Sequence, residues 1–221
     1  MSKPYRLVVF DWEGTLSDTL GQTFYYVAKE ARRLNFGELD EDLARKLVDL
    51  GLNHALQRLF PHLTLKEHET LLQAVQNHHL QRLTQIHLLP GAKEFVEQLD
   101  KHGFMLAIAT NKGQQGLTRA LVASNLQPFF KITRTASQCT AKPATQMLEE
   151  IIEQAGVLPE ETLMIGDSVT DIEMAKGCHV DAIGVSFYHQ HITALLAAGA
   201  MGVFFNYPEL AESLNLFQRK D

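Results

Sequence analysis

Apolar and polar residues follow two different periodicities along this chain, and the change between them predicts its organisation. Leu7-Val8-Val9-Phe10 is an unbroken apolar run, typical of a strand buried on both faces of a parallel sheet. From about residue 20 to residue 88, apolar positions recur every three or four residues, as in helices that bury one face. After Leu89-Pro90-Gly91, short apolar runs alternate with helical patterns. The pattern therefore predicts a helical insertion directly after the first strand.

The predicted elements follow from these patterns and from the Gly, Pro and Asn residues between them. In the insertion, we expect helices over residues 20–34, 41–50 (capped by Asp40), 53–60 and 65–86. Beyond it, we expect helices over 92–102, 114–124, 145–155 and 171–176, and strands over 104–109, 129–133, 162–165 and 182–185. Strands that alternate with helices predict an α/β fold with a doubly wound parallel sheet. The expected domains are a core of residues 1–16 and 90–221 and a helical cap of residues 17–89.

Composition narrows the class of protein. The 221 residues are 45% hydrophobic and 21% charged, as in ordinary soluble domains, and the net charge of −6 disfavours a nucleic-acid partner. Cys139 and Cys178 form no Cys-x-x-Cys pair, and no signal-peptide pattern or membrane-length apolar run occurs. We expect a cytoplasmic protein with no membrane partner. Neither Gly-x-Gly-x-x-Gly nor a P-loop occurs, which disfavours NAD or ATP as ligand.

Candidate chemistry lies where the predicted strands end. Asp11, Thr110 and Asp167 each follow an apolar run, and Lys142 precedes a predicted helix. Taken singly, each has an ordinary explanation as a turn residue, a helix cap or a solvated lysine. The carboxyl ends of parallel strands share one edge of a sheet, however, so these side chains should converge there. Two carboxylates, a hydroxyl and a lysine suit phosphoryl transfer through a metal ion and an aspartyl-phosphate.

The order of these motifs resembles the haloacid dehalogenase superfamily. The matching segments are Asp11-x-Glu13-Gly14-Thr15-Leu16, Thr110-Asn111, Lys142-Pro143 and Gly166-Asp167-Ser168-x-x-Asp171. The helical insertion resembles the small-cap branch that includes phosphoglycolate phosphatase and β-phosphoglucomutase. The resemblance covers essentially the whole chain. It implies a Mg²⁺-dependent phosphatase acting on a small phosphorylated metabolite, and we expect a monomer or homodimer.

The resemblance also implies roles for the catalytic residues. Asp11 would attack the phosphorus atom, and Lys142 would stabilise the charge that develops. Mg²⁺ would be held by Asp11, Asp167 and the backbone carbonyl of Glu13. Asp171 would either support the metal or orient Lys142.

Substrate contacts are expected from two parts of the chain. Thr110, with the neighbouring Asn111, would bind the phosphate. His54 follows the break at Gly51 in the insertion, where a loop could approach Asp11, so it is a further candidate.

Glu13 departs from the family pattern, since phosphatases of this family usually carry aspartate two residues after the nucleophile. That residue protonates the leaving oxygen and later activates water, and a glutamate retains this proton chemistry. Its extra methylene displaces the carboxylate by roughly 1 Å, and such a shift can cost about 10²-fold in rate. Two other functions stay open: a phosphomutase with the same catalytic set, and a catalytically silent binding protein. Gly14-Thr15 and the Asp167/Asp171 pair disfavour a dehalogenase.

Overall fold

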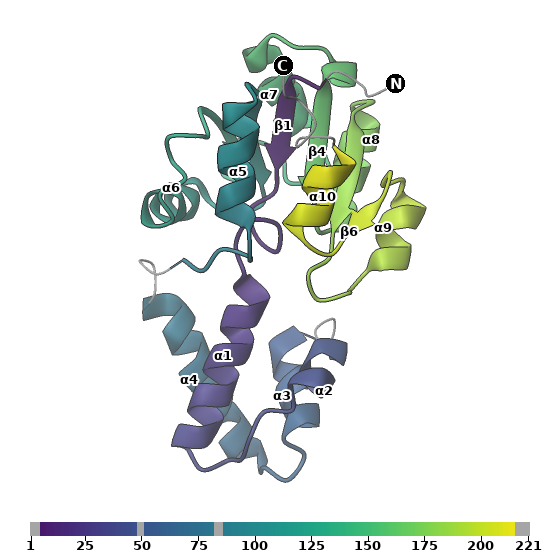
Figure 1. Ribbon diagram of the computed structural model, residues 1–221. Helices are drawn as coiled ribbons and strands as arrows, with labels where there is room; N and C mark the ends of the chain where they lie inside the picture. The colour runs from purple at the N-terminus through teal and green to yellow at the C-terminus, as the bar shows by residue number, and fades with distance from the viewer. Residues whose placement is uncertain (1–4, 48–50, 82–85, 215–221) are drawn as a thin grey trace. The chain divides into compact units, whose positions relative to one another are not determined.

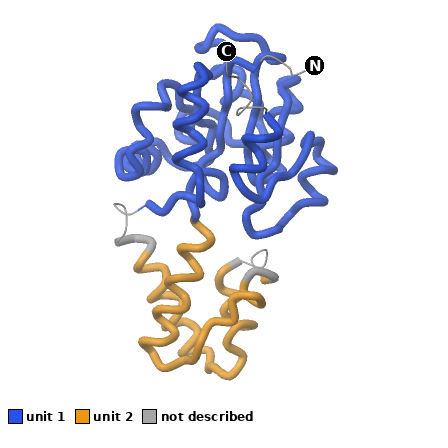
Figure 2. The backbone as a smooth tube through the Cα atoms, viewed as in Figure 1, with its two compact units in different colours: residues 1–18, 85–221 blue, residues 19–84 orange. Residues whose placement is uncertain are grey.

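A computed structural model describes residues 5–47, 51–81 and 86–214 of the protein. The chain divides into two compact units, Met1–Asp18 with Gln85–Asp221 and Thr19–Thr84 (Figure 2). The domains expected from the sequence differ from this partition by two residues at the first boundary and five at the second. That the helical unit acts as a cap stays a prediction.

The first unit contains a six-stranded parallel sheet with the order β3-β2-β1-β4-β5-β6 (Figure 1). In chain order the strands are β1 (Leu7–Phe10), β2 (Met105–Thr110), β3 (Ile132–Thr135), β4 (Thr162–Gly166), β5 (Asp181–Val185) and β6 (Val203–Phe204). Phe10 pairs with Ile108 of β2 on one side and with Ile165 of β4 on the other. Strands β1, β2 and β4 therefore end side by side, and the expected α/β class is confirmed.

Helices cover both faces of this sheet, because alternate residues of each strand point to opposite faces. Val8 and Phe10 belong to one hydrophobic cluster, and Leu7 and Val9 belong to another. Helices of the first cluster are α5 (Ala92–Lys101), α6 (Gln114–Ala123) and α10 (Tyr207–Ser213), and α5 and α10 lie on the near side of the sheet in Figure 1. Helices of the second cluster are α7 (Gln146–Ala155), α8 (Val169–Gly177) and α9 (Ile192–Ala198). A short 3₁₀ helix, η2 (Pro159–Glu161), precedes β4.

Among its described residues, the second unit contains helices joined by turns and no strand. Its helices are α1 (Thr19–Arg33), α2 (Glu41–Lys46), α3 (Gly51–Leu59) and α4 (Leu65–Gln81). As expected, Asp40 caps α2, with its carboxylate accepting a hydrogen bond of 2.9 Å from the Leu43 N–H. The unit has its own hydrophobic core, to which Tyr26, Leu56 and Leu71 contribute buried side chains.

Several expected boundaries are wrong, each for a local reason. The strand expected at residues 129–133 lies at Ile132–Thr135, since Phe130 packs into the core from the turn before the strand rather than from within it. Ile86 is not helical, so the long helix of the insertion does not extend that far, and Leu50 lies outside the described residues. The sequence analysis also missed α9, β6 and α10. β6 has only two residues, both half-buried, which is too short to show a periodicity.

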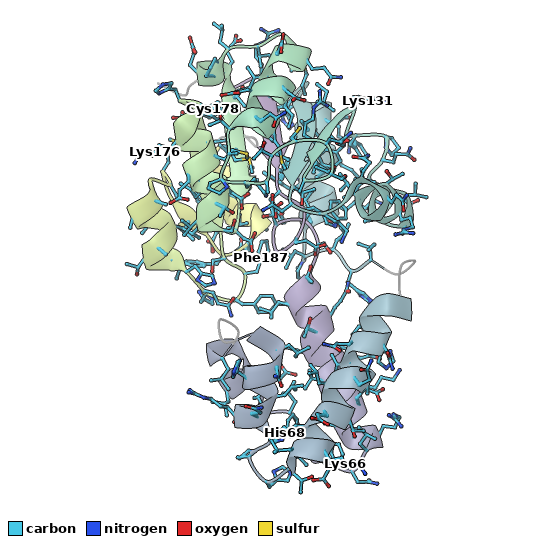
Figure 3. The ribbon with its side chains drawn as sticks, turned by 180° about the vertical axis from the view of Figure 1, so that it is seen from behind. Lys66, His68, Lys131, Lys176, Cys178 and Phe187 are labelled. Atoms are coloured by element: carbon cyan, nitrogen blue, oxygen red, sulfur yellow. The ribbon has the colours of Figure 1, made fainter. Side chains whose placement is uncertain are left out.

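The described residues also bear on the cysteines and on membrane insertion. Cys139 and Cys178 are free and buried, and Cys178 directly follows α8 (Figure 3). None of the described helices combines the length and apolar character needed to cross a bilayer.

Candidate active site

Lys142 and Asp11 form the centre of the candidate site. Asp11 directly follows β1, and its backbone N–H donates to the Ile165 carbonyl at 3.0 Å, which fixes its position at the sheet edge. Its side chain is buried, as is that of Lys142. The Lys142 ammonium donates to Asp11 Oδ1 at 2.6 Å, to Asp171 Oδ1 at 2.6 Å and to the Ala109 carbonyl at 3.2 Å. Since an ammonium has three donors, these contacts fully satisfy it and fix its orientation.

Asp171 holds Lys142 from the first turn of α8. Its Oδ2 accepts hydrogen bonds from the Ser168 N–H at 3.1 Å and the Ser168 hydroxyl at 2.7 Å, which forms a capping box at the start of the helix. Gly166 makes this approach possible, because a Cβ there would lie 2.4 Å from the Asp171 Cβ. The cap geometry thus places Asp171 Oδ1 against the Lys142 ammonium.

Asp167 completes a group of three carboxylates. Carboxylate oxygens of Asp11, Asp167 and Asp171 lie within 4.8 Å of one another. The Thr15 hydroxyl donates to Asp167 Oδ1 at 3.3 Å. Gly14 has a φ of +74°, and a Cβ on it would lie 2.0 Å from Asp167 Oδ2, so only glycine fits there. Hard oxygen donors gathered in this way fit a divalent cation of the Mg²⁺ or Ca²⁺ type.

The charges in this group are unbalanced. Two of the three carboxylates, Asp11 and Asp171, contact the single ammonium, and when all three are ionised two negative charges are in excess. Burial raises the pKa of Asp11, Lys142 opposes this rise and Asp171 adds to it, which leaves the pKa at about 6. Burial, Asp11 and Asp171 likewise raise the pKa of Asp167 well above its ordinary value. Burial lowers the pKa of Lys142, but the two carboxylates beside it outweigh burial and raise it to about 12. A divalent cation would balance the excess charge.

Thr110 and Asn111 organise the end of β2. The buried Thr110 hydroxyl oxygen accepts a hydrogen bond of 3.2 Å from the Lys112 N–H. The Asn111 side-chain oxygen accepts one of 2.9 Å from the Lys142 N–H. Asn111 therefore ties the Lys142 loop to the end of β2, and its expected contact with substrate stays a prediction.

Glu13 forms an ion pair that the sequence analysis missed. The Lys112 ammonium donates to Glu13 Oε1, and the side chains of Lys112 and Glu13 are 28% and 38% exposed. Lys112 immediately follows Thr110-Asn111 in the same turn. A cation next to a strand-end hydroxyl is a signal that could have identified it.

The structure thus brings six of the seven predicted site residues into one unit. Asp11, Asn111 and Lys142 are linked by hydrogen bonds, Asp167 joins Asp11 in the carboxylate group, and Glu13 is linked through Lys112 to Thr110. The seventh, His54, is exposed on α3 in the helical unit. Its expected approach to Asp11 stays a prediction.

A doubly wound parallel sheet with a lysine and three carboxylates at its carboxyl edge defines a hydrolase of the haloacid dehalogenase type. The chain belongs to this family: the profile of the haloacid dehalogenase-like hydrolases matches residues 8–185. It is 30% identical over 193 residues to a phosphoglycolate phosphatase of Mesorhizobium japonicum, covering 85% of this chain and 84% of the relative. The expected membership is confirmed, and the protein is an enzyme of the hydrolase class.

Solved structures agree with this assignment. A Thermotoga maritima protein described as a candidate β-phosphoglucomutase has a TM-score of 0.73 and 25% identity, covering 95% of this chain and 98% of that one. A family hydrolase from Deinococcus radiodurans has a TM-score of 0.75 at 20% identity, with 97% of each chain covered, and supports the fold.

Proposed function

We propose that this protein is a Mg²⁺-dependent phosphatase that hydrolyses a small phosphorylated metabolite through an aspartyl-phosphate on Asp11. The observation that carries the proposal is the group of three carboxylates, two of them buried and in contact with a single lysine, with two negative charges in excess when all three are ionised. Likeness to the Mesorhizobium japonicum phosphoglycolate phosphatase supports a phosphate monoester as substrate and makes 2-phosphoglycolate the first to test.

Asp11 is the nucleophile in this proposal. One of its carboxylate oxygens attacks the phosphorus atom, the bond from phosphorus to the ester oxygen breaks, and the electron pair leaves with that oxygen. Glu13 gives the leaving oxygen a proton. It then takes a proton from the water that attacks the phosphorus of the aspartyl-phosphate, which releases inorganic phosphate and restores Asp11.

The other residues bind and orient. Lys142 holds Asp11 in one orientation and offsets negative charge on the phosphoryl group, while Asp171 keeps the lysine in place. Thr110 and Asn111 bind phosphate oxygens. Asp11, Asp167 and the Glu13 backbone carbonyl would hold Mg²⁺. When bound, Mg²⁺ supplies the positive charge that lets a carboxylate approach a phosphate dianion.

The unit Thr19–Thr84 is proposed to be the cap that selects the substrate, with His54 as a candidate contact. A cap that closes over the core would exclude water and complete the pocket. Mg²⁺ with a phosphate mimic should then slow hydrogen exchange in the segments that join the two units. Unchanged exchange there, with the ligand bound, would argue against a moving cap.

A phosphomutase is the second candidate, because the Thermotoga maritima structure is similar over almost the whole chain. Both enzymes would form the aspartyl-phosphate, but a mutase would return the phosphoryl group to a sugar rather than to water.

Phosphate release from a small panel tests these functions. The panel contains 2-phosphoglycolate, β-glucose 1-phosphate, ethyl phosphate and p-nitrophenyl phosphate, each with Mg²⁺ or with EDTA. We expect release that requires Mg²⁺ and that Asp11→Asn abolishes. Full activity in EDTA or in Asp11→Asn would contradict the proposed mechanism. Formation of glucose 6-phosphate without phosphate release would establish the mutase instead, and no turnover of any compound would favour a silent protein.

A further inference from the structure

The position of Glu13 raises a geometric problem. Its side chain has one more methylene and one more rotatable bond than the aspartate usual at this place in the family. A longer side chain has more rotamers, and an acid that must meet one oxygen atom needs a single orientation. Some neighbouring group must therefore select the productive rotamer of Glu13.

Lys112 is placed to do this. Its ammonium donates to Glu13 Oε1 across the gap between the loop after β1 and the loop after β2. Its backbone is held separately, through the N–H that donates to the Thr110 hydroxyl oxygen at 3.2 Å. Lys112 therefore reaches Glu13 from a backbone that the candidate phosphate-binding residue already fixes.

Gly116 leaves space for the Lys112 side chain. It runs along the first turn of α6, where residue 116 is glycine. A Cβ on Gly116 would lie 3.2 Å from Lys112 Cε, which is closer than most such contacts, and 3.5 Å from its Cγ, which is an ordinary contact distance. Glycine is unfavourable inside a helix, but at position 116 its lack of a side chain leaves room for the aliphatic part of Lys112.

The ion pair does little for folding. With side chains 28% and 38% exposed, Lys112 and Glu13 interact partly through water, where such pairs add little to stability. We propose that Lys112 is a positioning residue that orients the Glu13 carboxylate toward the leaving oxygen of the substrate. This inference rests on the proposed phosphatase function.

The competing role for Lys112 is direct binding of the substrate phosphate, beside Thr110. The two roles differ in how the effects of substitutions combine. If Lys112 acts through Glu13, its removal costs nothing more once Glu13 is gone. If it binds phosphate, the two losses multiply. The effect on the first step, which forms the aspartyl-phosphate, also depends on the leaving group, because only a poor leaving group needs the proton that Glu13 supplies.

The test uses the full chain with Mg²⁺ and the variants Lys112→Met, Lys112→Arg, Glu13→Ala and Lys112→Met/Glu13→Ala. Both kcat and KM are measured on ethyl phosphate and on p-nitrophenyl phosphate. Lys131→Met is the matched control (Figure 3). Lys131 is an exposed lysine that directly precedes β3, so it lies at the amino end of that strand, whereas the site lies at the carboxyl ends of the strands.

We expect Lys112→Met to lower kcat on ethyl phosphate by about 10²-fold, as for a displaced catalytic group, with KM little changed. The loss in kcat/KM on p-nitrophenyl phosphate, which reports formation of the aspartyl-phosphate, should be smaller than about threefold, since that leaving group is stable as an anion. Lys112→Arg should recover part of the activity, and the double variant should match Glu13→Ala. Lys131→Met should behave as the unaltered protein.

Losses that multiply in the double variant, equal losses in kcat/KM on both substrates, or a raised KM with unchanged kcat would each overturn the positioning role while leaving the phosphatase function intact. An unaltered protein that releases phosphate from none of the four compounds of the panel overturns the proposed function, and this inference with it.

Discussion

Asp11→Asn should abolish turnover and yet stabilise the metal-free protein at neutral pH. The reason is the crowding of negative charge at the site, where the carboxylates of Asp11, Asp167 and Asp171 lie within 4.8 Å of one another. An asparagine has nearly the shape of a protonated aspartate and removes one of these charges. It also removes a charge that raises the pKa of Asp167. Nucleophile and charge repulsion are thus lost together.

The size of the effect follows from the pKa of Asp11. Burial raises it from 3.8 to about 6, even though Lys142 opposes the rise. Because a tenfold change in acidity corresponds to about 1.4 kcal/mol, ionised Asp11 lowers the free energy of unfolding by about 3 kcal/mol at pH 7.5. A raised pKa in the folded state means that stability is present at low pH and lost as the pH rises. The gain in the free energy of unfolding that Asp11→Asn provides should therefore be about 2 kcal/mol smaller at pH 4.5 than at pH 7.5.

Urea unfolding in EDTA measures this directly, with both proteins compared at pH 7.5 and pH 4.5. Unfolding in the presence of Mg²⁺ is a second test. A cation that binds the folded state at about 100 times its Kd adds about 2.7 kcal/mol to the unaltered protein, and it should add less to Asp11→Asn. Equal destabilisation of the variant at both pH values, or equal stabilisation of both proteins by Mg²⁺, would refute the electrostatic reasoning.

Two further predictions concern packing near and far from this site. Gly14→Ala should lower turnover by about 10²-fold, because its Cβ would lie 2.0 Å from Asp167 Oδ2 and displace that carboxylate; activity persisting near the original level under saturating Mg²⁺ would contradict this. In the helical unit, burial opposes ionisation of Glu30, but hydrogen bonds from His78 at 2.7 Å and Arg33 at 2.6 Å outweigh it and lower its pKa. Glu30→Gln should therefore lower the free energy of unfolding of this unit by about 2 kcal/mol at pH 7, which faster hydrogen exchange in α1 and α4 would report. This loss should become smaller as the pH drops through the pKa of Glu30, and a loss that does not change with pH would exclude the charged pairing.

Much of the fold could be predicted from local patterns. The buried run Leu7–Phe10 and the strands that end at Thr110 and Gly166 follow from apolar runs bounded by polar or glycine residues. Parallel strands share an edge, so convergence of Asp11, Thr110 and Asp167 needed no knowledge of side-chain positions. The C-terminal elements were missed, because β6 is held by its pairing with β5 rather than by a pattern of its own.

The sequence by itself thus determined the class of fold, the order of the motifs and the edge of the sheet where their chemistry gathers. Only the tertiary structure decided which groups touch. It placed Asp171 against the Lys142 ammonium, and it paired Glu13 with a lysine 99 residues away. The physical reason is that periodicity records which residues are buried within a strand or helix. The partner of a polar side chain depends on loop paths and rotamers, such as the path that Gly116 leaves for Lys112, and these exist only in the folded chain.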